Sequence, residues 1–243
     1  MEKILENKIA VLTGGGGGIG RAIAEKLATH KMKIVLFGGN NQEKLRETQA
    51  VVEKYTECML LPGDLTNEGF IAVNIVQVIE KFGGVDVLIN NAGTAQNTPF
   101  EKISIAEFDE IMAINLRSPF VLTKLALPYL KKSDAATIIN IASVVSHAGY
   151  PQQSIYTASK HALLGMTKSL AAEYYQDDIR VHAISPGGVY TNMVKVSRPD
   201  LKPDGMIQPE EIADIIEFLL THRGNAVIDE ILVHRVNKQP FIV

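Results

Sequence analysis

Short apolar segments alternate with longer amphipathic segments along most of the chain, and this alternation restricts the fold more than any other feature. The segments at residues 9–12 and 34–37 are apolar at every position, which is typical of strands buried on both faces of a sheet. Strands joined by helices predict a parallel sheet with right-handed crossovers and helices on both faces. We expect an α/β fold with a doubly wound parallel sheet of about seven strands. The expected strands are Lys8–Thr13, Lys33–Phe37, Cys58–Pro62, Val85–Asn90, Ala136–Ser143, Ile179–Ser185 and Val227–Val233.

Helices are expected between these strands. Pro119 and Pro128 fall inside the fourth helix, and Pro119 is expected to kink it or to begin a new helix, because proline has no backbone N–H to donate. Nothing along the 243 residues resembles a linker or a repeat, so residues 1–243 are interpreted as a single domain. The expected helices are at about Gly18–His30, Gln42–Tyr55, Asn67–Phe82, Ser104–Lys131, Ser154–Gln176 and Pro209–His222.

The composition excludes several classes of protein. With 24 Lys and Arg against 27 Asp and Glu, the formal net charge is −3, which argues against a dedicated nucleic-acid-binding protein. Cys58 is the only cysteine, so the chain has neither an internal disulfide framework nor a multi-cysteine zinc site. No apolar run is long enough for a membrane-spanning helix, and the first residues contain no apolar signal core. We therefore expect a cytoplasmic protein that does not bind membranes.

A glycine-rich turn follows the first expected strand. In a turn between a strand and a helix, glycines let the backbone approach a pyrophosphate, and the N-terminus of the helix supplies N–H donors. The run satisfies two spacings, TGxxxGxG and TGxxGxxG, so it predicts a dinucleotide site without choosing between the families that use each spacing. Its residues are Thr13, Gly14, Gly15, Gly16, Gly17, Gly18, Ile19 and Gly20.

Further polar residues follow the ends of later strands, where parallel sheets bind their ligands. Asn90 and Asn91 follow the fourth strand, and an asparagine amide in this position can bridge neighbouring strands. Ser143 ends the fifth strand, and Tyr156 and Lys160 share one face of the next helix. An ammonium group beside a phenol lowers the pKa of the tyrosine and suits it to general acid/base catalysis. The Tyr–Lys spacing has weight only in this context, because about one such pair is expected by chance.

In this order along residues 8–233, the motifs resemble those of the classical short-chain dehydrogenases/reductases, and in particular the 3-oxoacyl-acyl-carrier-protein reductases. The ordered set comprises the glycine turn, Asp64, Asn90-Asn91-Ala92-Gly93, Asn115, Ser143, Tyr156 with Lys160, and Pro186-Gly187 with Thr191. The resemblance implies a single NAD(P)-binding Rossmann domain that interconverts a ketone and a secondary alcohol by hydride transfer.

The resemblance also implies a role for each residue of the site. Tyr156 would be the acid/base, and Lys160 would lower its pKa and hold the nicotinamide ribose. Ser143 would orient the substrate oxygen, and Asn115 would hold a water that links Lys160 to solvent. Asp64 would meet the adenine edge. The implied cofactor-binding residues are Thr13, Gly14, Gly16, Gly17, Gly18, Ile19, Gly20, Gly38, Gly39, Asp64, Leu65, Asn91, Ala92, Gly93, Tyr156, Lys160, Pro186, Gly187, Val189 and Thr191.

The choice of cofactor depends on the residues that follow the second strand, Phe37-Gly38-Gly39-Asn40-Asn41. No acid is present there to bind a ribose 2′-hydroxyl and reject a 2′-phosphate, which favours NADP(H) slightly over NAD(H). The arginine that often follows in NADP-dependent relatives is replaced by Gly39, and Lys44 or Arg46 are the basic residues that remain nearby. The histidines show no metal-ligand spacing, so no metal is expected.

The expected substrate is a small carbonyl or alcohol compound, and a 3-oxoacyl thioester, which an acyl carrier can hold, is the best single candidate. Ala171-Ala172-Glu173 stands where the acyl-carrier reductases often have a basic residue, although Lys131 and Lys132 remain to face an acidic carrier. One alternative is a polyol or hydroxy-acid dehydrogenase of the same family. An alternative of another class is a regulator that senses a dinucleotide without turnover.

The surroundings of the site are also expected from the sequence. Residues 188–208 are expected to form a substrate lid, in which Lys195 or Arg198 would meet an anionic substrate. The loop of residues 144–155 is expected to line the pocket, with His147 as a wall residue, and Cys58 is expected to be buried and inert. Since family members are commonly tetramers joined through their fourth and fifth helices, here about Ser104–Lys131 and Ser154–Gln176, the resemblance implies a homotetramer or a homodimer.

Overall fold

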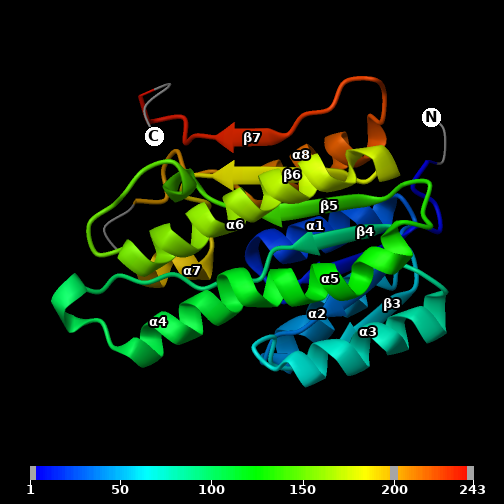
Figure 1. The fold of residues 1–243 in the computed structure, drawn as a ribbon, viewed down its shortest axis with the longest axis horizontal. Helices are drawn as coiled ribbons and strands as arrows, with labels where there is room; N and C mark the ends of the chain where they lie inside the picture. The colour runs from blue at the N-terminus through cyan, green and yellow to red at the C-terminus, as the bar shows by residue number, and fades with distance from the viewer. Residues whose placement is uncertain (1–3, 198–201, 240–243) are drawn as a thin grey trace.

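Seven parallel strands form a sheet at the centre of the computed structural model, which describes residues 4–197 and 202–239. The strands lie in the order β3-β2-β1-β4-β5-β6-β7, and each neighbouring pair is parallel (Figure 1). The predicted α/β fold with a doubly wound sheet is therefore confirmed. The strands are β1 (Ile9–Thr13), β2 (Lys33–Phe37), β3 (Cys58–Leu61), β4 (Val87–Asn90), β5 (Thr137–Ile141), β6 (Arg180–Pro186) and β7 (Glu230–Val233).

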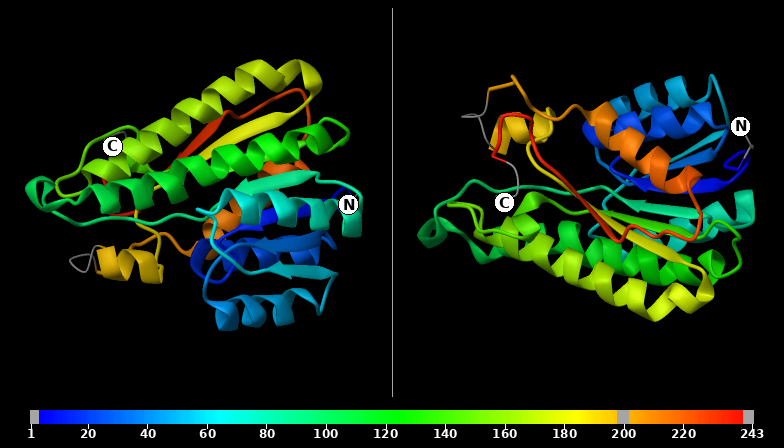
Figure 2. Two further views of the ribbon diagram at one scale, coloured as in Figure 1. Left: turned by 60° about the horizontal axis from the view of Figure 1, so that its bottom comes forward. Right: turned by 90° about the horizontal axis from the view of Figure 1, so that it is seen from above.

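Two layers of helices cover the two faces of the sheet (Figure 2). One layer contains α1 (Gly18–Thr29), α2 (Gln42–Val52) and α8 (Pro209–Thr221). The other contains α3 (Glu68–Phe82), α4 (Ile105–Met112), α5 (Ser118–Leu130) and α6 (Ser154–Tyr174). A short helix, α7 (Asn192–Ser197), lies beyond the ends of the strands. Short 3-10 helices occupy Phe100–Lys102, Val144–Ser146 and Tyr175–Asp177.

Consecutive residues of each central strand enter the cores on opposite faces, since side chains alternate along a strand. In β1, Ala10 and Leu12 belong to the core that contains α1 and α8, whereas Ile9 and Val11 belong to the core that contains α3 and α5. All four side chains are buried. Burial on both faces explains why these segments are apolar at every position.

The expected fourth helix over Ser104–Lys131 is divided in the structure. α4 passes into a π-helical turn over Ala113–Arg117, and α5 begins at Ser118. Pro119 lies in the first turn of α5, as expected for a residue without an N–H to give to the preceding turn. The π-turn contains Asn115, which is fully buried.

Some predicted boundaries differ from the structure at the ends of elements. β5 ends at Ile141 rather than Ser143, and β7 begins at Glu230 rather than Val227. The carbonyl oxygen of Ile228, before the start of β7, accepts a hydrogen bond from the side chain of His182. The sequence pattern does not predict α7, which lies in the expected lid at residues 188–208.

The lid prediction is only partly covered by the structure, because residues 198–201, including Arg198, lie outside the described residues. No helix within residues 4–197 and 202–239 is both long and apolar enough to cross a membrane.

Candidate active site

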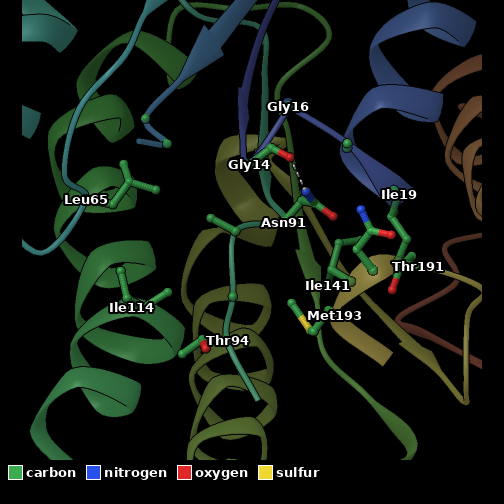
Figure 3. Close-up of a pocket in the computed structure, with 18 of the residues that line it drawn as sticks. Gly14, Gly16, Ile19, Leu65, Asn91, Thr94, Ile114, Ile141, Thr191 and Met193 are labelled. Atoms are coloured by element: carbon green, nitrogen blue, oxygen red, sulfur yellow. Dashed lines mark hydrogen bonds between the residues drawn. The ribbon is translucent and has the colours of Figure 1, made fainter. Parts of the chain in front are cut away.

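A cavity of about 530 Å³ lies at the carboxyl ends of the strands, where the strand order reverses between β1 and β4. Ligands bind at this position in parallel sheets. Residues that follow β1, β2, β3, β4, β5 and β6 line it, together with the first turns of α6. Leu65 and Ile114 lie on one side of the cavity, and Thr191 and Met193 lie on the other (Figure 3).

The glycine-rich turn after β1 forms one wall of the cavity and leads into α1. A Cβ at Gly20 would overlap the carbonyl oxygen of Gly14, so only glycine permits this close approach of turn and helix. The first turn of α1 contains no acidic residue, and Gly17 provides no side-chain cap. The N–H groups at this helix end are therefore available to an anion, which fits the pyrophosphate of a dinucleotide.

Thr13 lies beneath this turn and not on the cavity wall. Its hydroxyl accepts hydrogen bonds from the N–H groups of Asn91 and Ala92, both at 3.0 Å. The side-chain amide of Asn91 donates to the carbonyl oxygen of Gly14 at 3.2 Å (Figure 3) and to that of Thr13 at 3.0 Å. Thr13 thus joins the two turns that carry cofactor-binding candidates, and does not line the cavity itself.

Buried side-chain hydrogen bonds tie the ends of β4 and β5 to the helices behind them. Asn90 Nδ2 donates to Asn140 Oδ1 at 2.8 Å and to Thr123 Oγ1 at 3.2 Å. Asn140 Nδ2 donates to Thr167 Oγ1 at 2.8 Å. The predicted bridge between strands by an asparagine amide is confirmed, and it fixes the strand ends that precede Asn91 and Ser143.

Ser143 and Tyr156 both line the cavity. Ser143 follows β5, and Tyr156 lies in the first turn of α6. Burial raises the pKa of the Tyr156 phenol, and the hydrogen bond with Ser143 offsets part of this rise. The phenol is therefore protonated at neutral pH and is able to donate a proton.

Lys160 is buried one turn further along α6, with its Nζ 5.9 Å from the centre of the Tyr156 ring. Its ammonium group donates a hydrogen bond of 2.7 Å to the carbonyl oxygen of Ile141. Burial lowers the pKa of Lys160 to about 8. The predicted lowering of the Tyr156 pKa is not found, because the ammonium group is directed to Ile141 while burial acts on the phenol.

Asn115 joins the segment after β4 to α6. Its Oδ1 accepts from the N–H of Thr94 at 2.8 Å, and its Nδ2 donates to the Thr94 carbonyl oxygen at 2.9 Å and to Ser159 Oγ at 3.0 Å. Gly93 lies between Asn115 and Lys160, since a Cβ there would be 3.2 Å from Asn115 Oδ1 and 3.6 Å from Lys160 Nζ. Asn115 lies behind the cavity wall, and its part in a water relay stays a prediction.

The far end of the cavity is formed after β2. Gly38 and Gly39 have φ angles of 79° and 101°, and Gly39 forms an isolated bridge with Gly63. Asn40, Asn41 and Lys44 line this end, whereas Arg46, the other basic candidate, does not. Lys44 is thus the basic side chain closest to where a ribose phosphate is expected.

Two other candidates are already engaged within the protein. The carboxylate of Asp64 accepts from the N–H and the hydroxyl of Thr66, both at 2.8 Å, although Asp64 does line the cavity. Lys195 lies over the ring of Tyr190, 4.3 Å from its centre, and is not part of the cavity wall. The suggested contact of Lys195 with an anionic substrate is therefore not supported by its position.

Apart from Thr13, every predicted cofactor-binding residue lines the cavity. Several lining residues are not predicted from the sequence. Two of them, Glu110 and Ile114, could have been found, because their i, i+4 spacing places them on one face of the helix that leads to Asn115. Those not predicted are Leu45, Gly63, Thr94, Glu110, Ile114, Ile141 and Ala142.

The remaining candidates lie away from the cavity. His147 is not a wall residue, because its Nε2 is 2.6 Å from Glu230 Oε1 on β7, and the loop of residues 144–155 does not contribute to the wall. Cys58 is buried, and burial raises the pKa of its thiol to about 12. Within the described part of the chain, no group of three or more His, Cys, Asp or Glu side chains is placed to hold a metal ion.

Comparison with known proteins supports an oxidoreductase site. The family model for short chain dehydrogenase matches residues 8–202. A 3alpha-hydroxysteroid dehydrogenase from Mediterraneibacter gnavus is 35% identical, over 96% of this chain and 97% of that protein. A 3-oxoacyl-acyl-carrier-protein reductase from Aquifex aeolicus is 32% identical over the same shares, 96% and 97%. The crystal structure of a metagenomic short-chain oxidoreductase in complex with NADP has a TM-score of 0.83 and 33% identity, over 95% of this chain and 98% of that one.

Proposed function

Because the chain belongs to the short-chain dehydrogenase family and is thus an NAD(P)-dependent oxidoreductase, we propose that it interconverts a ketone and a secondary alcohol, with Tyr156 as the acid/base. One observation carries this proposal: Ser143, Tyr156 and the glycine-rich turn all line the same cavity. Two hydroxyl donors in one cavity wall suit a carbonyl oxygen. The uncapped end of α1 suits a dinucleotide pyrophosphate.

In the proposed reduction, the bound nicotinamide cofactor supplies the hydride for the carbonyl carbon. Tyr156 donates its proton to the carbonyl oxygen, and Ser143 donates a hydrogen bond to the same oxygen and fixes its direction. Burial raises the pKa of the phenol, so Tyr156 holds its proton until negative charge develops on the substrate oxygen. Lys160, with a pKa of about 8, is mostly charged at neutral pH and lies with its Nζ 5.9 Å from the centre of the Tyr156 ring.

NADP(H) is the preferred cofactor in this proposal. No acid follows β2, and Lys44 lines the cavity at that end together with Asn40 and Asn41. The similar metagenomic oxidoreductase was crystallised with NADP, which agrees with this preference. Lys44 is exposed, so the preference for the 2′-phosphate is expected to be moderate.

A 3-oxoacyl thioester is the first substrate class to test, because the Aquifex aeolicus relative is a 3-oxoacyl-acyl-carrier-protein reductase. The structure gives little support for carrier docking through Lys131, which pairs with Asp177 at 2.8 Å and lies over the ring of Tyr174. A hydroxysteroid or other cyclic alcohol is the second class. It is supported by the Mediterraneibacter gnavus relative and by the apolar lid residues Met193 and Val194 in the cavity wall.

The proposal is tested by fluorescence titration of the protein with NADPH and NADH, followed by turnover assays. Acetoacetyl-coenzyme A, a 3-ketosteroid, 3-hydroxybutyrate and a polyol represent the competing substrate classes. Reduction or oxidation of any of them, with loss of turnover in Tyr156→Phe, supports the proposal. Tight cofactor binding with no turnover on any class would instead favour a dinucleotide-sensing regulator.

A further inference from the structure

The first turn of α6, which carries Tyr156, is capped by a side chain from a distant part of the chain. Gln96 belongs to the segment between β4 and α4, and lies 59 and 60 residues before the two residues that it binds. Its Oε1 accepts hydrogen bonds from the N–H groups of Ile155, at 2.9 Å, and Tyr156, at 3.1 Å. These first-turn N–H groups have no acceptor within the helix.

The helix provides no cap of its own at this end. Gln153, at the N-cap position, makes no side-chain hydrogen bond to the first turn. Gln96 is 3% exposed and Ile155 is 4% exposed, so water cannot readily replace the missing acceptor. Gln96 therefore supplies the bonds that an N-cap side chain usually makes.

The segment that carries Gln96 also touches the cavity. Its first residues, Asn91 to Thr94, line the cavity wall. The backbone N–H and carbonyl oxygen of Thr94 form hydrogen bonds with Oδ1 and Nδ2 of Asn115. Further along, the N–H of Thr98 donates to the carbonyl oxygen of Gln152 at 3.0 Å, which joins the same segment to the loop before α6. Gln96 lies between these two attachments and connects the cofactor side of the cavity to the acid/base helix.

We propose that Gln96 is a positioning residue for the reaction, and that its amide oxygen holds the first turn of α6 so that the Tyr156 phenol meets Ser143. The proposal rests on the proposed role of Tyr156 as the acid/base. The backbone of Tyr156 itself is one of the two groups bound, so a shift of this turn moves the phenol directly. Misplacement of a reacting group by about 1 Å lowers turnover by up to about a hundredfold.

Two substitutions separate the amide oxygen from the rest of the side chain. Gln96→Met keeps the length and removes the acceptor. Gln96→Glu keeps an acceptor for both N–H groups, and its negative charge is favourable at a helix N-terminus. The Nε2 group of Gln96 has no hydrogen-bond partner among the described residues, so Gln96→Glu loses no donor that is in use.

For Gln96→Met, we expect kcat to fall by about ten- to a hundredfold, while the Kd for NADPH changes by less than about twofold. Gln96→Glu should recover most of kcat, with a pH profile for turnover displaced to higher pH, because a nearby carboxylate opposes the phenolate of Tyr156. Asn67→Ala is the matched control, since Asn67 Oδ1 accepts from Phe70 N–H and caps α3 away from the acid/base helix. It should lower the thermal stability and leave kcat unchanged.

Three results would overturn the proposal. These are an unchanged kcat in Gln96→Met, a loss of kcat in Gln96→Glu as large as that in Gln96→Met, or a loss of kcat in Asn67→Ala as large as that in Gln96→Met. If Gln96→Met does not fold, hydrogen exchange of the wild-type protein decides instead. Protected amides at Ile155 and Tyr156 support the cap, and exchange at the rate of a free helix end contradicts it. A wild-type protein without turnover would contradict the proposed function, whereas the exchange measurement still tests the cap.

Discussion

At the scale of single residues, the proposed role of Tyr156 requires its phenol to hold a proton for reduction and to release it for oxidation. Burial raises its pKa and thereby favours the protonated form. The phenolate fraction therefore grows with pH over the whole accessible range, and we expect kcat/KM for alcohol oxidation to rise from about pH 6 to about pH 9. Carbonyl reduction uses the protonated form and should not show this rise. Initial rates in both directions across this range measure the difference.

The substitution Tyr156→Phe provides the control for this pH dependence. Removing the hydroxyl should lower kcat by about a hundredfold or more, because a positioned proton donor contributes about that much. Fluorescence titration should give a Kd for NADPH close to that of the wild type. A variant that keeps most of its turnover would show that another group transfers the proton.

The second prediction at this scale concerns Lys44. Lys44→Ala should raise the Kd for NADPH by about two- to fivefold and leave the Kd for NADH nearly unchanged, since an exposed ion pair contributes up to about 1 kcal/mol. Arg46→Ala is the matched control, because Arg46 is two residues away and does not line the cavity. Equal effects on both dinucleotides, or a larger effect from Arg46→Ala, would place the phosphate contact elsewhere.

At the scale of elements, His182 joins β6 to the loop before β7. Its Nδ1–H donates to the carbonyl oxygen of Ile228 at 2.6 Å, and its Nε2 is buried without a partner among the described residues. Burial lowers the pKa of His182 below its ordinary value of 6.5. The unfolded chain therefore takes up the proton first as the pH falls, so the free energy of unfolding decreases below about pH 6.5.

Urea unfolding at several pH values between about 5 and about 8 measures this decrease. His182→Asn keeps a donor toward Ile228 but does not titrate, so its stability should depend less on pH, although it is less stable at pH 8 because it leaves a cavity. The exposed His222 provides the control, and His222→Asn should keep the wild-type pH dependence. Identical pH dependence in wild type and His182→Asn would exclude His182 as the cause.

Elements that depend on local pattern could be predicted from the sequence, whereas those that depend on distant partners could not. The strands are apolar at every position because both faces are covered, so their pattern is visible residue by residue. The π-turn around Asn115 has no such pattern, since it depends on how Thr94 and Ser159 pack against it. The cap on α6 could not be predicted from the sequence for the same reason, because Gln96 lies far from α6 along the chain.

At the scale of the whole molecule, the position of the site follows from the topology. Turns at the carboxyl ends of parallel strands converge on one edge, so the residues after each strand were expected to meet, and the cavity wall contains nearly all of them. The local environment was not predictable in the same way. Burial raises the pKa of Tyr156, and the ammonium group of Lys160 donates to the carbonyl oxygen of Ile141. The spacing of Tyr156 and Lys160 in the sequence predicts neither of these features.

The resemblance implies an interface between copies of the chain through the expected fourth helix, which the structure divides into α4 and α5, and the expected fifth helix, which is α6. Ile105, Phe108 and Phe120 on α4 and α5 are 77%, 43% and 52% exposed. Large apolar side chains in this position lose their contact with water when a second copy of the chain covers them. We therefore propose that these helices form an interface between copies of this chain.

Light scattering coupled to size exclusion should give a mass that is two or four times 26.5 kDa for the wild-type protein. The double substitution Phe108→Glu and Phe120→Glu should reduce this mass, because like charges would be brought together in a buried interface. Tyr55→Glu is the control, since Tyr55 is 54% exposed but lies after α2, in the other helix layer. A wild-type monomer, or an unchanged mass in the double variant, would exclude α4 and α5 as the interface.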